Sequence, residues 1–140
     1  MNVHDPAFLK RRGMTLLELT AVILVVMSLL TVIFVGATMW KRGADRANCV
    51  ANIRKVQLAV RGYANLNGFW PGDDLSMESP PLNLESEIFG PDKMLDRYPL
   101  CPASGIYGFS GHAVPPLGTL FMRCSLELER EHAPSNFSGW

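Results

Sequence analysis

The sequence MTLLELTAVILVVMSLLTVIFVGATMW at residues 14–40 contains a single charged side chain, Glu18. The 22 residues from Leu19 to Trp40 carry no charge and are rich in Val, Leu, Ile, Met and Phe. As an α-helix this run is roughly 33 Å long, which is enough to cross the hydrocarbon core of a bilayer. We therefore expect a membrane-spanning helix, in a chain of 140 residues that has room for one modest domain besides.

Apolar residues continue C-terminal to this run, but they become periodic. Their spacings of three and four are typical of an amphipathic helix, and they are Ala47, Val50, Ile53, Val56, Val60 and Tyr63. Because no proline interrupts this part of the chain before Pro71, both segments can form one helix from about Thr15 to Leu66. Its end is predicted by Asn65, Asn67 and Gly68, followed by Trp70-Pro71-Gly72.

The rest of the chain predicts a small head with little regular structure. Residues 71–97 are rich in proline and acids, and we expect a loop with at most a short helix at 84–89 or 92–98. Residues 105–110 and 118–124 alternate well enough to form two antiparallel strands. The predicted fold class is α+β, in which a long N-terminal helix packs its second half against a small antiparallel sheet.

Charge is unevenly distributed although the formal net charge is zero. Residues 41–66 carry six basic side chains and one acidic one, whereas residues 67–140 carry ten acidic and four basic ones. A basic stem and an acidic head suit packing of the head of one copy on the stem of another, but two solvated faces that never meet explain the pattern as well. Nucleic-acid binding is not expected, because that would require basic residues without this acidic balance.

The three cysteines are Cys49, Cys101 and Cys124, and their spacing fits neither a zinc site nor a Cys-x-x-Cys redox motif. One bridged pair and one spare thiol are expected. A bridge that closes the loop from Cys101 to Cys124 would contribute about 3 kcal/mol to a small head and would imply an oxidising compartment.

Candidate catalytic and metal-binding residues are few, so we expect neither an enzyme nor a cofactor. His4, His112 and His132 are scattered without metal-ligand spacing, and the tail from Glu129 to Trp140, which contains His132, is expected to be loose. Seven acids could supply oxygen ligands to calcium, but they lack the spacing of an EF-hand and are better explained as solvated side chains: Asp73, Asp74, Glu78, Glu85, Glu87, Asp92 and Asp96.

Glu18 is the one acid within the apolar run, and an ionised carboxylate there costs a few kcal/mol unless it has a partner. Cleavage between Gly13 and Met14 would create an α-amino group four residues before it, with which the carboxylate of a neighbouring subunit could pair. Alternatively, Glu18 lies among the lipid headgroups, where it is solvated or paired with Arg11 or Arg12.

The segment Arg12-Gly-Met-Thr-Leu-Leu-Glu18, followed by about twenty apolar residues, resembles the class III leader of type IV pilins and type II secretion pseudopilins. The resemblance implies that a prepilin peptidase cuts after Gly13 and N-methylates Met14, and that Glu18 drives assembly. The chain departs from the family in having Met14 where phenylalanine is usual. It also has Val35 where many pilins have a kinking proline, so the helix is expected to be straighter or to bend at Gly36.

A second similarity extends over more of the chain. The segments Arg46-Ala-Asn-Cys-Val-Ala-Asn-Ile-Arg54 and Cys101-Pro-Ala-Ser-Gly-Ile-Tyr107, with the later Cys124, resemble a pseudopilin-like group. This resemblance favours a disulfide between Cys101 and Cys124 and leaves Cys49 on the stem.

The resemblance implies a structural subunit of a pilus-like filament, most simply a pseudopilin in protein secretion. Its partners would be its own copies, other pilins, the prepilin peptidase and the inner-membrane assembly platform, with the N-terminus cytoplasmic and the head periplasmic. The alternative is a stationary single-pass membrane anchor with a periplasmic head that binds a partner. The expected parts are a cleaved leader at 1–13, a transmembrane half-helix at 14–40, an amphipathic half-helix at 41–66 and a globular head at 67–140.

Overall fold

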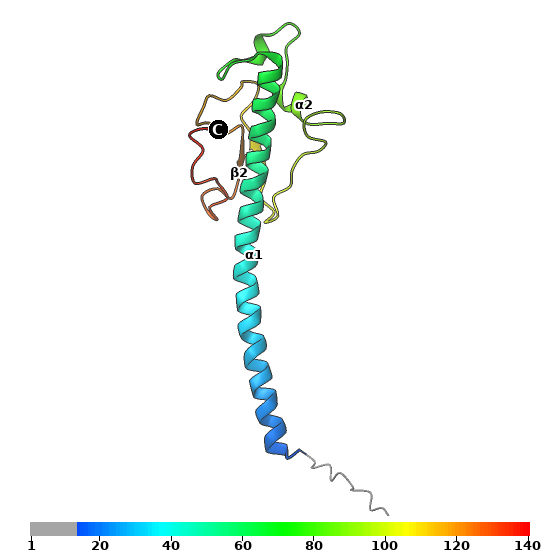
Figure 1. Cartoon of the computed structure of the whole chain (residues 1–140), viewed down its shortest axis with the longest axis vertical. Coiled ribbons are helices and arrows are strands. Elements are labelled where there is room, and N and C mark those ends of the chain that lie inside the picture. Colours follow the sequence, from blue (N-terminus) through cyan, green and yellow to red (C-terminus); the bar gives the residue numbers. More distant parts are fainter. Residues whose placement is uncertain (1–13) are drawn as a thin grey trace, which may run out of the picture. The chain divides into compact units, whose positions relative to one another are not determined.

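The computed structural model describes residues 14–140 and has one long helix followed by short elements (Figure 1). In chain order these are α1 (Leu16–Asn67), the 3-10 helix η1 (Leu75–Met77), α2 (Leu84–Ile88), β1 (Tyr107–Phe109) and β2 (Met122–Cys124). The predicted α+β class, with a long apolar N-terminal helix and a small antiparallel sheet, is confirmed. The chain divides into two compact units, one ending at Met39 and the other comprising Trp40–Trp140.

Both ends of α1 are determined by local capping. At its start the Thr15 Oγ1 accepts a hydrogen bond from the Glu18 amide at 3.2 Å, which satisfies one of the free amides of the first turn. At its end Gly68 has a φ of +75°, and the Phe69 amide donates to the Ala64 carbonyl at 2.9 Å. This is a Schellman motif, for which glycine is favoured because it adopts positive φ without strain. The predicted helix bounds are therefore correct to within one residue.

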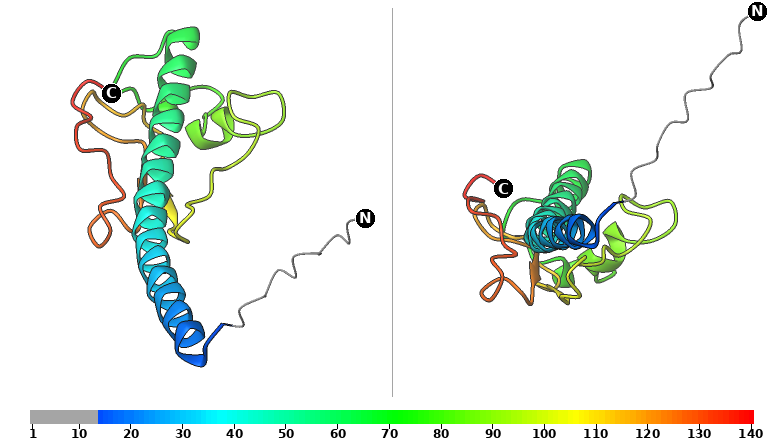
Figure 2. Two further views of the ribbon diagram at one scale, coloured as in Figure 1. Left: turned by 60° about the horizontal axis from the view of Figure 1, so that its bottom comes forward. Right: turned by 90° about the horizontal axis from the view of Figure 1, so that it is seen from below.

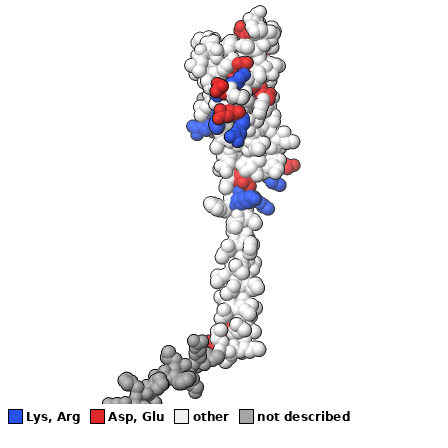
Figure 3. Space-filling model, turned by 90° about the vertical axis from the view of Figure 1, so that its right-hand side faces the viewer, with Lys and Arg blue, Asp and Glu red and all other residues white. Residues whose placement is uncertain are grey.

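The described part of the first unit consists of Met14, Thr15 and the N-terminal part of α1, and every described side chain in it is exposed. The helix continues through Gly36 without a break. Four hydroxyl groups are satisfied inside the helix, because each donates to a carbonyl oxygen one turn earlier: Thr20, Ser28, Thr31 and Thr38. Figure 3 shows the surface of this segment as almost entirely uncharged. By length and composition it is a candidate membrane span.

The second unit has a hydrophobic core around the C-terminal part of α1. The loop that carries α2 lies on one side of this helix and the C-terminal segment on the other (Figure 2). Of the six residues in the predicted apolar stripe, Ile53, Val56 and Val60 are at most 1% exposed, and the others are half-buried or exposed. The core also contains Leu75, Leu84, Ile88, Val114, Leu120, Phe121 and Met122.

Gln57 is a buried side chain that joins α1 to the segment before β2. Its Nε2 donates to the Thr119 carbonyl at 3.1 Å, and its Oε1 accepts from the Phe121 amide at 2.9 Å. Since both polar ends of the side chain are paired, it can be buried without the cost of unsatisfied polar groups. The contact holds the approach to β2 against α1.

The strands are shorter than the sequence predicts. β1 and β2 are antiparallel with Gly108 opposite Arg123, and each has three residues. The intervening residues do not form a tight hairpin, because Val114 pairs elsewhere. The Gly72 amide donates to the Val114 carbonyl and the Val114 amide to the Asp73 carbonyl, both at 2.8 Å.

The expectation of a loose tail at residues 129–140 is wrong. The Arg61 guanidinium donates from Nη1 to the Pro115 carbonyl at 2.6 Å and from Nη2 to the Trp140 carbonyl at 2.8 Å. The Arg54 guanidinium also lies over the Trp140 ring, 5.6 Å from its centroid. Because these basic side chains bind the end of the chain to α1, the tail is ordered against the core.

Candidate functional site

Two groups of residues are candidates for a function, and the first is at the start of α1. Met14 is 68% exposed, and Glu18 lies in the first turn of the helix. Among residues 14–140 the Glu18 carboxylate has no ion-pair or hydrogen-bond partner. The predicted cleavage position Gly13 and the basic residues Arg11 and Arg12 lie outside the described residues.

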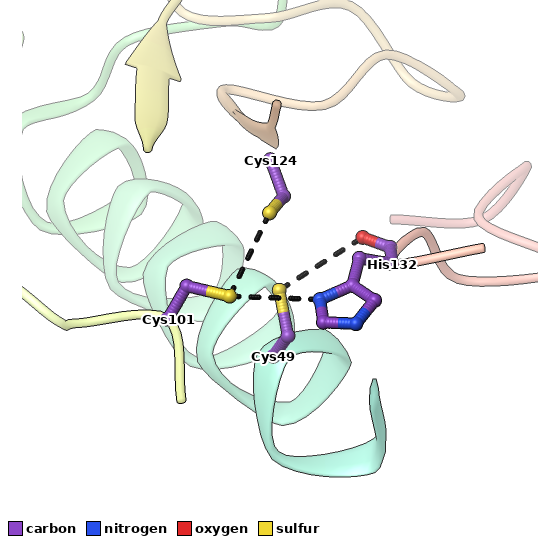
Figure 4. Close-up of side chains that lie close together, drawn as sticks. All are labelled: Cys49, Cys101, Cys124 and His132. Carbon is purple, nitrogen blue, oxygen red and sulfur yellow. Dashed lines mark hydrogen bonds between the residues drawn. The ribbon is translucent and has the colours of Figure 1, made fainter. Parts of the chain in front are cut away.

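The second group is a buried cluster of three cysteines and a histidine (Figure 4). Cys49 projects from α1, Cys101 from the loop after α2, Cys124 from the end of β2 and His132 from the C-terminal segment. Their exposed fractions are 0%, 8%, 4% and 2%, respectively. One ligand atom from each residue lies within 4.8 Å of all the others. We call these four residues the Cys/His cluster.

Cys101 is the hub of the cluster. Its Sγ lies 3.8 Å from the Cys124 Sγ and 3.5 Å from the His132 Nδ1. Cys49 approaches from the helix, with its Sγ 3.9 Å from the His132 carbonyl oxygen. The Tyr107 hydroxyl donates to the Cys49 Sγ at 3.3 Å, so this sulfur also has a polar neighbour from β1.

The disulfide implied between Cys101 and Cys124 is not formed in this structure, in which all three cysteines, each within the described residues, are free. The sulfur atoms are 3.8 Å apart, whereas a disulfide bond is about 2.05 Å long. The expectation that Cys49 stands apart on the stem also differs from the structure, because its buried thiol belongs to the same cluster.

No protein family, curated protein or solved structure matches this chain.

The backbone around the cluster favours charge on some sulfurs and not on others. Burial acts to raise the pKa of Cys101, but the Ala103 and Gly105 backbone and the neighbouring Cys124 and Cys49 thiols together outweigh it, so this pKa lies below its ordinary value. Burial raises the pKa of Cys124, although the Leu126 amide opposes the rise. Burial raises the pKa of Cys49 to about 12, so its thiol stays protonated at neutral pH unless a cation binds.

Gly105 packs directly against the cluster, and its replacement tests that packing. A Cβ at this position would lie 2.7 Å from the Cys124 Sγ and 3.1 Å from the Cys101 Sγ, closer than side chains tolerate. We expect Gly105→Ala to lower the free energy of unfolding by about 1–3 kcal/mol, because a crowded site must shift its side chains or backbone.

The control is Gly108→Ala in β1, where a Cβ meets nothing within 4 Å. Urea unfolding of the full chain in detergent would compare the two variants with the parent. Equal stability of all three proteins would show that the cluster leaves room for a Cβ at position 105.

The sequence predicts no metal ligands, and no pattern in it connects these four residues. Cys49 lies four residues before Ile53, so it belongs to the buried stripe, but nothing local indicates what it faces. His132 is eight residues after Cys124, a spacing that fits no short metal motif. The acids considered for calcium do not gather: within residues 14–140 the Cys/His cluster is the group of His, Cys, Asp and Glu ligand atoms close enough to share an ion.

Proposed function

We propose that this chain is a structural subunit of a type IV pilus-like filament, most simply a pseudopilin of type II secretion. The observation that carries the proposal is the surface of the first unit, a long helical segment whose apolar side chains are all exposed and whose single acid has no partner within the described residues. Such a surface needs a cover that residues 14–140 do not provide.

Two environments can cover this segment in turn. In the inner membrane the lipid chains would contact the apolar side chains, and the helical backbone would satisfy its own polar groups. In a filament the same side chains would pack against the helices of neighbouring copies through a contact that repeats without closing. The apolar part of α1 would therefore anchor the subunit in the membrane before assembly and pack against other subunits after it.

Glu18 would favour assembly by forming an ion pair with a neighbouring subunit. In a dry helical array an unpaired carboxylate is costly, whereas pairing with the α-amino group of a processed Met14 on a neighbour would neutralise both charges. The leader must then be removed between Gly13 and Met14, because cleavage creates that amine. N-methylation keeps the amine basic, and the prepilin peptidase is the expected processing partner.

The second unit would form the periplasmic part of the subunit. Within it Arg46 already pairs with Glu131 at 2.6 Å, whereas Lys41, Arg42, Arg54 and Lys55 form no ion pair with the described residues. These four exposed cations are therefore the part of the basic stem that can contact acidic side chains of another copy. Exposed pairs of this kind set orientation more than affinity.

The test is the N-terminal mass of the full chain recovered from membranes with a prepilin peptidase present and absent. We expect a chain that begins at a methylated Met14 only when the peptidase is present. A chain that begins at Met1 in both cases would overturn the proposal and favour the stationary single-pass anchor with a partner-binding head.

A further inference from the structure

Two distances between ligand atoms of the Cys/His cluster match those of a tetrahedral metal site, and all four ligand atoms lie within 4.8 Å of one another. Zinc binds sulfur at about 2.3 Å and imidazole nitrogen at about 2.0–2.1 Å, so tetrahedral ligands lie about 3.8 Å apart for two sulfurs and about 3.6 Å for sulfur and nitrogen. The Cys101 Sγ is 3.8 Å from the Cys124 Sγ and 3.5 Å from the His132 Nδ1. We propose that Cys49, Cys101, Cys124 and His132 bind one zinc ion as a structural site of the second unit.

The ligand set favours zinc over other common ions. Three soft thiolates and one imidazole suit a tetrahedral Zn²⁺, whereas calcium and magnesium require oxygen ligands. All four positions are filled by the protein and are at most 8% exposed, which leaves no open position for water or substrate. A closed site of this kind stabilises a fold and does not perform catalysis.

The surroundings of the sulfurs support metal binding. The Tyr107 hydroxyl donates to the Cys49 Sγ at 3.3 Å, and the Asn52 Nδ2 donates in turn to the Tyr107 oxygen at 3.3 Å. Hydrogen bonds of this kind orient the ligands of a metal and disperse the negative charge on the thiolates.

The ion would join four segments that are distant in sequence. Cys49 belongs to α1, Cys101 to the loop before β1, Cys124 to β2 and His132 to the C-terminal segment. The sheet holds only three residue pairs, so it contributes little to fixing these segments. Small domains with few regular elements gain much of their stability from such cross-links.

A disulfide between Cys101 and Cys124 is the competing outcome, and the two can be distinguished. A disulfide uses two cysteines and needs neither Cys49 nor His132. The zinc site needs all four residues and keeps all three thiols reduced. Cys49 and His132 are therefore the residues whose replacement separates the two states.

The experiment uses the full chain in detergent, produced in medium with added zinc. We expect about one zinc per chain by elemental analysis and three alkylated cysteines after denaturation without reductant. Replacement of zinc by cobalt should give the d–d absorption of a tetrahedral site together with a sulfur-to-cobalt charge-transfer band.

The variants are His132→Gln and its matched control His112→Gln, which changes an exposed histidine. We expect His132→Gln to weaken zinc binding by more than the ~10–100-fold that loss of an outer-shell partner costs, and His112→Gln to leave it unchanged. Cys49→Ser should weaken zinc binding similarly.

Should these variants fail to fold, the parent chain decides alone, because modification of its thiols with a mercurial should release its zinc in parallel. A Cys101–Cys124 disulfide without metal would overturn the proposal. Three reduced thiols that bind neither zinc nor cobalt would also overturn it.

Discussion

Glu18→Gln is expected to reduce filament assembly by about 100-fold or more while leader cleavage continues. The substitution keeps the side-chain volume but removes the charge that would pair with the α-amino group of Met14 on a neighbour. Breaking one member of a buried ion pair costs about 3–5 kcal/mol, and each 1.4 kcal/mol is a factor of ten in association. The effect should be confined to assembly, because an uncharged side chain is easier to hold in a membrane.

The measurement is the ratio of filament to membrane-bound subunit after shearing of cells that also contain the assembly machinery. Thr20→Val is the matched control. Thr20 lies within the same turn and a half of α1, but its hydroxyl already donates to the Leu17 carbonyl at 2.9 Å and needs no partner from another copy. Normal filament yield from Glu18→Gln would mean that this carboxylate is solvated among the headgroups, as the alternative interpretation holds.

Phe121→Ala is expected to lower the free energy of unfolding of the second unit by about 3–5 kcal/mol. Phe121 is fully buried, and its ring centroid lies 5.8 Å from that of Phe109. The centroid of the Phe109 ring in turn lies 5.6 Å from that of Phe89 and 5.9 Å from that of Tyr98. One aromatic cluster therefore joins β1 to the loop that carries α2. Removal of the Phe121 ring leaves a cavity in the buried core.

Urea unfolding of the full chain in detergent, detected by limited proteolysis, would measure this loss of unfolding free energy. Trp70→Ala is the control because it also removes an aromatic ring, but from a side chain that is 77% exposed. We expect the control to remain within about 0.5 kcal/mol of the parent. A loss below about 1 kcal/mol for Phe121→Ala would show that the ring is not part of a close-packed core.

The parts of the fold that follow from local chemistry were predictable. The apolar run, the absence of proline and Gly68 predict α1 to within one residue at each end, because helix propagation and capping depend on neighbours in the chain. The short helix α2 occurs at the first of its two predicted places. Strand existence was also predictable, but strand length was not, since Val114 pairs with residues 72–73 and leaves the hairpin short.

The two candidate groups of residues also differ in how far the sequence predicts them. Gly13, Met14 and Glu18 form a local pattern, and its resemblance to the pilin leader is why a processing position and an assembly residue can be proposed without a structure. The Cys/His cluster is different, because its members come from residues 49, 101, 124 and 132 and meet only after the chain has folded. Spacing along the chain carries no information about such a meeting.

The sequence by itself determined a long apolar helix with one acid near its start, because hydropathy, helix period and caps act over a few residues. The tertiary structure alone decided where Cys49 and His132 lie. Packing of the stripe around Ile53 directs Cys49 inward, and contacts of Arg54 and Arg61 with Trp140 hold the tail that carries His132. These are long-range contacts, and their free energies depend on the whole core being assembled.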